Sequence, residues 1–347
     1  MNITKRIALT SMIGVSALLL AACSGGATTP TTAPEPTATE SPALPEKPDQ
    51  LTKVTVGLWA NVIDTAYLQL GVEQGFFADQ NLEVEFVTVA GGDEGVSALV
   101  SGNVDFTIAN VVTLIQAVDK GLPIRGIVGA VSGGGQTDPD AVGIFVPEGS
   151  SVQSPIDLEG KKVGVFQIND VTALWVLAAV EQDGGDPTTI QQVTGTQVDR
   201  RQLLEAGEID ATLTTGGFFA LAQADGHHLL LNPQKATMGP NAPSIFMLVN
   251  SQWADQNPAV ARAFQIAAGK SADYAEQHRD EWRAILPELF PNVVPDAEAA
   301  SKVSAYWSSC LTQDGLAKPA EYMTSWGWID NQLTAEDLIW EQSPPFC

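Results

Sequence analysis

The stretch that decides the fold is KVTVGLWANVIDTAYLQLGVEQGFFADQNLEVEFVTV, residues 53–89. Apolar side chains alternate between Lys53 and Trp59, a pattern that is typical of a strand. Apolar residues then recur at Tyr67, Leu70 and Phe77, which is the spacing of one helix face, and the segment LEVEFVTV alternates again. A strand, a helix and a strand in this order predict two parallel strands joined by a covering helix.

The same alternation of strands and helices continues along most of the chain. Further strands are predicted at 104–110, 124–131, 141–147, 162–166, 190–195, 209–215, 228–231 and 244–253, with helical segments between most of them. After residue 253 the pattern is mainly helical. The sequence therefore predicts two α/β units, each a mostly parallel sheet flanked by helices, followed by a helical C-terminal tail.

The first fifty residues predict export and attachment to a membrane. Lys5 and Arg6 precede an uncharged apolar run that ends at Ala22, as in a secretory signal peptide. The sequence LAAC that ends at Cys23 resembles the lipobox of bacterial lipoproteins, and this resemblance implies lipid on Cys23. We expect 1–22 to be a lipoprotein signal peptide and 23–50, rich in Thr and Pro, a disordered tether. An ordinary signal peptide with an incidental cysteine is the alternative.

Composition restricts the partners. The chain has 347 residues, of which 41 are acidic and 17 basic, for a net charge of −24. Such a charge disfavours nucleic acid and anionic lipid headgroups as partners. The chain has three cysteines. If Cys23 carries lipid, Cys310 and Cys347 remain, and an oxidising compartment predicts a disulfide between them. Two free thiols are the alternative. No metal-binding spacing or cofactor motif is present, and we expect neither a metal nor a cofactor.

Three stretches resemble one family. They are AYLQLGVEQGFFADQNLEVEFV from Ala66, GGDEGVSALVSGNVDFTIAN from Gly91, and DLEGKKVGV from Asp157. In order and spacing they are similar to the SsuA/THI5-like solute-binding proteins of ABC importers. The resemblance implies a two-lobed type II periplasmic-binding-protein fold, with lobe I formed by 51–150 plus 243–347 and lobe II by 151–242. Two chain crossings would act as the hinge.

Candidate ligand-binding residues follow from that architecture, because open α/β sheets bind ligands beyond the carboxyl ends of their strands. We expect the two lobes to contribute Trp59, Asn61, Gly92, Asp93, Asn110, Val111, Gln167, Asn169, Asp170, Gly217 and Phe218. Two alternatives stay open. Trp59 is equally suited to a place in the core, and the turn at Gly92 is equally suited to simple helix capping by Asp93. We also expect Asn110→Ala to weaken binding without changing the stability of the unliganded protein.

The predicted function is that of a monomeric solute-binding protein, anchored outside the cytoplasm and working with the permease of an ABC importer. A tethered receptor that presents its ligand to a sensor partner is the alternative. An enzyme similar to the THI5-type pyrimidine synthase is disfavoured by the predicted export, and the chain has no G-x-S-x-G or H-E-x-x-H motif. The candidate loops carry no basic residue, so an amine-bearing or heteroaromatic solute fits at least as well as a sulfonate; nitrate, thiamine precursors and riboflavin also stay open.

Overall fold

The computed structural model describes residues 47–59, 63–135, 139–291 and 294–341. The predicted signal peptide, Cys23 and most of the predicted tether lie outside these residues, as do Asn61 and Cys347. The last four residues of the predicted tether are described, and they contact the folded body: Lys47 Nζ donates to the Asp79 carbonyl at 3.1 Å, and Asn81 Nδ2 to the Pro48 carbonyl at 2.7 Å. No helix in the described part of the chain is long and apolar enough to cross a membrane.

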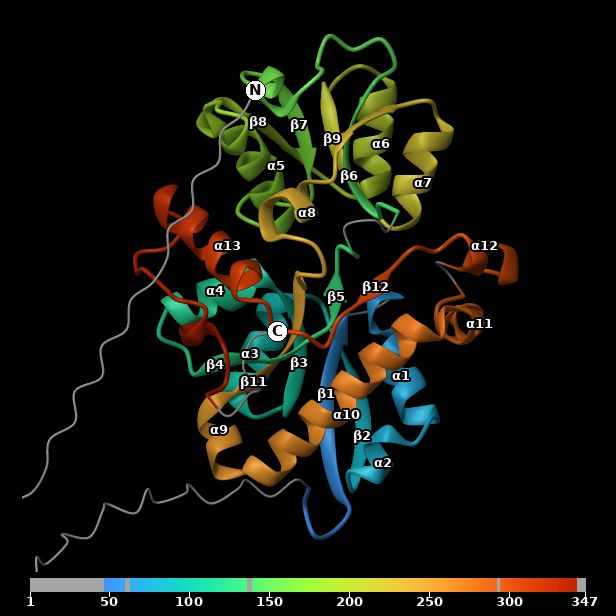
Figure 1. The fold of residues 1–347 in the computed structure, drawn as a ribbon, viewed down its shortest axis with the longest axis vertical. Coiled ribbons are helices and arrows are strands. Elements are labelled where there is room, and N and C mark those ends of the chain that lie inside the picture. Colours follow the sequence, from blue (N-terminus) through green and yellow to red (C-terminus); the bar gives the residue numbers. More distant parts are fainter. Residues whose placement is uncertain (1–46, 60–62, 136–138, 292–293, 342–347) are drawn as a thin grey trace, which may run out of the picture. The chain divides into compact units, whose positions relative to one another are not determined.

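Lobe I is built on a five-stranded sheet in the order β2-β1-β3-β11-β4 (Figure 1). The strands β1, β2, β3 and β4 run parallel, and β11 runs antiparallel between β3 and β4. The bounds are β1 Thr52–Trp59, β2 Leu82–Val89, β3 Phe106–Asn110, β4 Ile124–Gly129 and β11 Ile245–Asn250. β3 and β11 are buried along nearly their whole length, as expected for strands covered on both faces.

The helices on the first half of lobe I are α1 Ala66–Glu73, α2 Phe76–Asp79, α3 Gly92–Ser101 and α4 Val111–Asp119. The single helix predicted from Tyr67 to Phe77 is in fact two helices. Gly75 separates them with φ of +79°, a left-handed conformation that glycine adopts at little cost. A short 3-10 turn at Ile63–Thr65 precedes α1.

Lobe II has its own five-stranded sheet in the order β10-β6-β9-β7-β8. Its strands are β6 Val142–Val146, β7 Lys162–Val165, β8 Gln191–Thr194, β9 Ala211–Thr215 and β10 His228–Leu231. β7, β8, β9 and β10 run in the same direction, and β6 runs antiparallel between β10 and β9. The flanking helices are α5 Val171–Gln182, α6 Gln197–Glu205, α7 Gly217–Ala224 and α8 Pro233–Met238, with 3-10 turns at Pro155–Leu158 and Pro187–Thr189.

The boundary predicted at residue 150 is wrong, because β6 belongs to lobe II. Its buried residues pair with β9 on one side and β10 on the other, so the first crossing lies before Val142. A continuous apolar run does not reveal which sheet completes its hydrogen bonds, which is why the sequence assigned it to lobe I. The second crossing ends where β11 begins at Ile245, close to the boundary predicted at 243.

The C-terminal tail returns to lobe I, as the helical pattern indicated. It contains α9 Ser251–Gln256, α10 Pro258–Gln277, α11 Arg279–Leu289, α12 Ala297–Ser301, β12 Tyr306–Trp307, α13 Gln313–Ser325 and a 3-10 turn at Glu336–Leu338. β12 pairs with β5 Val131–Ser132, a two-residue strand directly after β4. The chain then closes against β4, where the Trp340 N–H donates to the Gly126 carbonyl at 3.0 Å.

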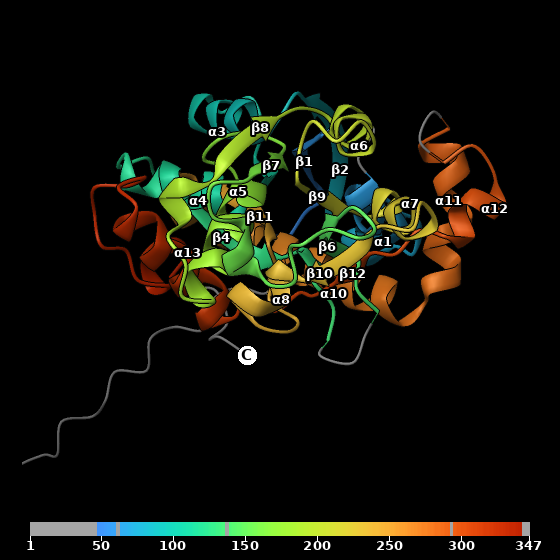
Figure 2. The same cartoon turned by 90° about the horizontal axis from the view of Figure 1, so that it is seen from above.

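One apolar core joins the two lobes on a single flank. α4 of lobe I, α5 and α8 of lobe II, and α13 of the tail contribute to the same buried cluster, and Figure 2 shows α4, α5 and α13 gathered on one side. Trp175 of α5 is 3% exposed, and its indole Nε1 lies 3.4 Å from Met238 Sδ in α8. At the outer end of α5, Trp326 Nε1 donates to Glu181 at 2.6 Å, and Gln182 donates to the Tyr322 hydroxyl at 2.9 Å.

Because this core spans both lobes, we expect them to unfold together. Trp175→Ala should lower the free energy of unfolding by about 3–5 kcal/mol, the usual effect of removing a buried large aromatic side chain. Leu221→Ala is the control, because Leu221 is 43% exposed and its truncation should cost less than about 0.5 kcal/mol. Differential scanning calorimetry should show one transition for all three proteins. Two separated transitions in the wild-type protein would contradict a shared core.

Candidate functional site

Helices begin shortly after the carboxyl ends of strands in both lobes, and the predicted ligand-binding residues other than Trp59 and Asn61 lie at four of these junctions. In lobe I, α3 follows β2 and α4 follows β3. In lobe II, α5 follows β7 and α7 follows β9. Such junctions place backbone N–H groups and short polar side chains at one edge of each sheet. The four junctions differ in how their helix N-termini are capped.

The α4 junction is capped by a side chain. Asn110 ends β3, and its Oδ1 accepts a hydrogen bond from the Thr113 N–H at 3.0 Å. Val111 is fully buried and its N–H donates to the Ser244 carbonyl at 2.8 Å, so its side chain belongs to the core. The structure therefore leaves Asn110, through its amide nitrogen, as the member of this pair that is available to a ligand.

The α3 junction lacks a side-chain cap. Gly91 occupies the N-cap position, and Asp93 is an exposed residue inside the first turn. The alternative that Asp93 caps this helix is therefore wrong, and its role in ligand binding stays a prediction. Glu94 instead reaches back to accept a hydrogen bond from the Ala90 N–H at 2.6 Å. A Cβ atom at Gly92 would lie 2.9 Å from Thr113 Oγ1, so glycine is what allows α3 to start against α4.

The α5 junction holds the largest set of predicted residues. Asp170 is the N-cap, and its Oδ1 accepts hydrogen bonds from the Ala173 N–H at 2.9 Å and from the Thr172 hydroxyl at 2.7 Å. Gln167 and Asn169 are exposed in the preceding loop, and Asn169 has φ of +58°, a conformation that Asn tolerates better than most residues. Burial raises the pKa of Asp170, while its hydrogen bonds and the charge of Arg200 oppose that rise.

Two apolar side chains in this loop were not among the predicted ligand-binding residues. Phe166 is 51% exposed and Ile168 is 60% exposed, and they alternate with Gln167 and Asn169. Large apolar groups that stay exposed at the edge of a sheet often mark a binding surface. Their alternation with polar residues directly after a buried strand is the signal that could have revealed them.

The α7 junction is again capped by glycine. Gly216 has φ of +55°, and the helix starts at Gly217, which is exposed. Phe218 is half-buried, and the next ring, Phe219, packs edge-on against Phe145 at 5.0 Å between ring centroids. A Cβ atom at Gly217 would meet nothing within 4 Å, so this position faces open space.

Trp59 packs partly in the core, and its contact with a ligand stays a prediction. It ends β1, is half-buried, and packs against the apolar core of lobe I. Its Nε1 is buried and has no acceptor among the described residues. Buried indole N–H groups usually find a partner, which makes Trp59 an unusual residue for a pure core position.

The two lobes contact each other beside the α5 junction. Gln116 Nε2, on α4 of lobe I, donates to the Asn169 carbonyl of lobe II at 3.4 Å. Gln116 lies beyond the first turn of α4, so this contact joins the body of α4, and not the junction at Asn110, to the loop before α5. The assignment of Asn110 and Asn169 to one site stays a prediction.

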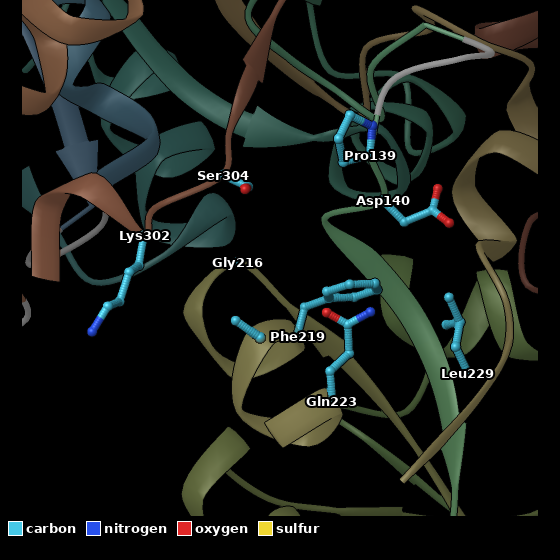
Figure 3. A pocket seen from close by; sticks show the side chains of 9 residues that line it. Pro139, Asp140, Gly216, Phe219, Gln223, Leu229, Lys302 and Ser304 are labelled. Carbon is cyan, nitrogen blue, oxygen red and sulfur yellow. The ribbon is translucent and has the colours of Figure 1, made fainter. Parts of the chain in front are cut away.

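A hollow of about 340 Å³ lies beside the α7 junction (Figure 3). It is lined by Gly216 and Phe219 of lobe II, by Asp140 of the first crossing, and by Lys302 and Ser304 of the tail. None of the predicted ligand-binding residues lines it. Its charged groups are already paired: Asp140 lies 3.1 Å from Lys235 Nζ, and Lys302 lies 2.7 Å from Glu298.

Arg200, a basic residue close to the lobe II junctions, was also missed. It lies on α6, is only 2% exposed, and its Nη1 donates to the Leu213 carbonyl of β9 at 2.6 Å. The candidate loops themselves contain no Lys or Arg, so the sequence indicated a site without cations. The signal was the placement of Arg200 on the sheet-facing side of a predicted helix, where charged residues are rare.

Among the described residues no three His, Cys, Asp or Glu side chains meet in an arrangement that could hold a metal ion. The histidines lie away from the junctions. His228 opens β10 and pairs with Val146, at the end of the lobe II sheet opposite the carboxyl ends of β7 and β9, and His278 lies between α10 and α11. The arrangement therefore offers hydrogen-bonding groups, helix N-termini and apolar surface, which are the elements of a binding site.

Two mainly parallel sheets with flanking helices, joined by two crossings, define the class: this is the two-lobed fold of type II periplasmic binding proteins. Solved structures agree. The periplasmic aliphatic sulphonate binding protein SsuA of Escherichia coli matches with a TM-score of 0.65 at 18% identity, covering 85% of this chain and 93% of that one. The periplasmic nitrate-binding protein NrtA of Synechocystis PCC 6803 matches with a TM-score of 0.63 at 14% identity, covering 82% and 83%.

The chain belongs to the NMT1/THI5-like family, whose model matches residues 63–282, more than half of the sequence. Among characterised proteins it is similar to the formylaminopyrimidine-binding protein of Halalkalibacterium halodurans. The two are 23% identical over 304 residues, which cover 83% of this chain and 88% of that protein.

The capping role of Asn110 changes what its substitution should do. Asn110→Ala should lower the free energy of unfolding by about 0.5–2 kcal/mol, because the Thr113 N–H loses its acceptor. Asn110→Asp keeps that acceptor and should leave stability nearly unchanged. Urea unfolding followed by circular dichroism measures both. If Asn110→Ala is as stable as the wild-type protein, the cap contributes little, and the sequence-based expectation of unchanged stability is correct.

Proposed function

We propose that this chain is the extracytoplasmic solute-binding component of an ABC importer and that it holds a small organic solute between its lobes. The observation that carries the proposal is that each lobe starts helices beyond the carboxyl ends of its strands, while Gln116 of α4 contacts the loop before α5 of the other lobe. Membership of the NMT1/THI5-like family and the named functions of the similar proteins support it. The proposed partners are the solute and the permease, with the chain acting as a monomer.

A neutral or amine-bearing heteroaromatic solute fits the described residues best. The junctions carry exposed apolar surface at Phe166 and Ile168, an exposed carboxylate at Asp93, and no exposed Lys or Arg side chain in the described loops. A sulfonate or nitrate would depend on N–H groups alone, without an exposed cation beside it. The similar protein of H. halodurans, which binds formylaminopyrimidine, supports this class.

The proposal treats the chain as a binding protein and not as an enzyme. Catalysis would need activated acid–base or nucleophilic groups at the site. At the described junctions the polar side chains are amides, carboxylates and threonine hydroxyls, and Asp170, which accepts from the Thr172 hydroxyl, is already engaged as a helix cap. The three histidines, one of which a synthase of the THI5 type would consume, lie elsewhere.

The binding proposal is tested by filling the proposed site. Gly217→Leu places a large side chain in open space at the α7 junction, so it should weaken solute binding at least about tenfold without lowering the melting temperature. Ala224→Leu adds the same side chain at the exposed far end of α7 and is the control. Isothermal titration calorimetry with formylaminopyrimidine, an alkanesulfonate and nitrate gives the affinities. Tight solute binding that is the same in Gly217→Leu and wild type would place the site elsewhere.

We further propose that Cys23 carries a lipid anchor and that Cys310 is bridged to Cys347. Both rest on the sequence, since Cys23 and Cys347 lie outside the described residues. Intact mass spectrometry of the protein extracted from membranes should show the added mass of a lipidated N-terminal cysteine, and two hydrogens fewer than the reduced chain. Cys23→Ala should remove the lipid mass and the membrane attachment. An unmodified mass, or a mass unchanged by reductant, would contradict the respective half of the proposal.

A further inference from the structure

The two crossings between the lobes are hydrogen-bonded to each other. The first crossing connects β4 to β6, and the second connects α8 to β11. The Ser244 N–H donates to the Val131 carbonyl at 2.8 Å, and the Asn241 N–H donates to the Gly134 carbonyl at 2.9 Å, in one antiparallel register. The crossings therefore form a single ribbon, and a change in one of them is transmitted to the other.

Gln234 of α8 ties this ribbon to lobe II. Its side chain is buried, at 1% exposure, and its Nε2 donates to Ser244 Oγ at 3.1 Å and to the Ala242 carbonyl at 3.4 Å. Both acceptors belong to the second crossing. α8 itself is fixed to lobe II, because its Met238 lies in the buried core with Trp175 of α5. The amide of Gln234 thus joins the second crossing to the body of lobe II.

The first crossing packs against the same side chain. A Cβ atom at Gly133 would lie 3.0 Å from Gln234 Cδ and 3.2 Å from its Cγ, so glycine allows the backbone of the crossing to approach the glutamine closely. The next residue, Gly134, has φ of +77°, which glycine adopts at little cost. Gln234 therefore contacts both crossings, one by packing and the other by hydrogen bonds.

A buried amide is an expensive way to fill space in a core. An apolar side chain of similar volume would pack there without the cost of removing polar atoms from water. The hydrogen bonds of an amide are directional, so they fix the distance and orientation of the groups that they join, whereas apolar contacts allow sliding. At Gln234 the groups joined in this way are α8 and the second crossing.

We infer that Gln234 is a positioning residue that sets the angle between the two lobes by fixing both crossings to α8. This inference rests on the proposed function and deepens it, because it identifies what holds the two halves of the site at their distance before the solute arrives. Gln234 is buried in the hinge and acts without touching the solute. Without its hydrogen bonds the unliganded protein should sample a wider range of lobe angles, and the solute would have to order the lobes itself.

The distance between the lobes tests this role directly. Gln234→Met keeps the volume of the side chain and removes both hydrogen bonds. Spin labels on unnatural ketone-bearing residues at Val100 of lobe I and Leu221 of lobe II, both exposed, allow pulsed electron paramagnetic resonance on the full chain without using its cysteines. The unliganded Gln234→Met protein should give a broader distance distribution than the wild type. Saturating formylaminopyrimidine should make the two distributions equal.

Binding should weaken in parallel. If about a third of the Gln234→Met molecules keep the competent lobe angle, the affinity for formylaminopyrimidine falls about threefold, although no group that touches the solute has changed. Isothermal titration calorimetry measures this loss. If no protein binds formylaminopyrimidine, the result counts against the proposed function, and the unliganded distance distributions still decide the role of Gln234.

Two further variants separate positioning from stability. Gln265→Met is the matched control, because Gln265 is 5% exposed and its Nε2 donates to the Ile127 carbonyl within lobe I at 2.6 Å. It should lower the melting temperature and leave the distance distribution at the wild-type width. Ser244→Ala removes one acceptor of Gln234 by a small change, so it should also broaden the distribution, and it should add nothing in the Gln234→Met background.

The result that would overturn the inference is a wild-type distance distribution in the hinge variants. If Gln234→Met and Ser244→Ala only lower the melting temperature, as Gln265→Met does, Gln234 stabilises the fold without setting the lobe angle. If Gln234→Met does not fold, Ser244→Ala alone decides between these outcomes, because its backbone groups and their hydrogen bonds to Val131 and Val111 are retained.

Discussion

The buried core that α13 shares with α4 of lobe I and with α5 and α8 of lobe II is the interaction on which the remaining structure depends. Two of these helices begin beyond the carboxyl end of a strand, α4 in lobe I and α5 in lobe II. The core therefore holds α4 and α5 on the same flank of the molecule, where Gln116 of α4 donates to the Asn169 carbonyl in the loop before α5 at 3.4 Å.

The helix N-termini at the four strand–helix junctions differ in how they are capped. At α4 and α5 the side chains of Asn110 and Asp170 satisfy the first backbone N–H groups, which stabilises the helices that hold the lobes together. At α3 and α7 the N-caps are Gly91 and Gly216, which have no side chain to offer. The capped pair stabilises the shared flank, and the glycine pair keeps the backbone accessible.

The sequence predicted the architecture well, whereas the ligand-binding residues stay predictions. Alternation and helical spacing located most of the strands and helices because burial imposes those periods directly. The assignment of β6 failed because its apolar run fits either sheet, and only the pairing with β9 and β10 decides. The positions of Asn110 and Asp170 at helix starts were readable from their side chains and their neighbours.

Other site residues could not be predicted from local pattern. Val111 is buried because the Ser244 carbonyl and the lobe I core surround it, and these are contacts with distant sequence. Arg200 is recognised as a buried cation only when the carbonyls of Gly164 and Leu213 are in place around it. Local sequence reports the faces of single elements, whereas a binding site is assembled from the ends of several elements.

The central claim is that the carboxyl edges of both lobes enclose one solute. Hydrogen–deuterium exchange of the chain with and without saturating formylaminopyrimidine tests it most directly, because backbone protection is read segment by segment. The account predicts simultaneous protection of the α3 and α4 junctions of lobe I, at Gly92 and Asn110, and of the α5 and α7 junctions of lobe II, at Asn169 and Gly217. Protection confined to one lobe, or to the hollow beside Phe219 and Ser304, would contradict it.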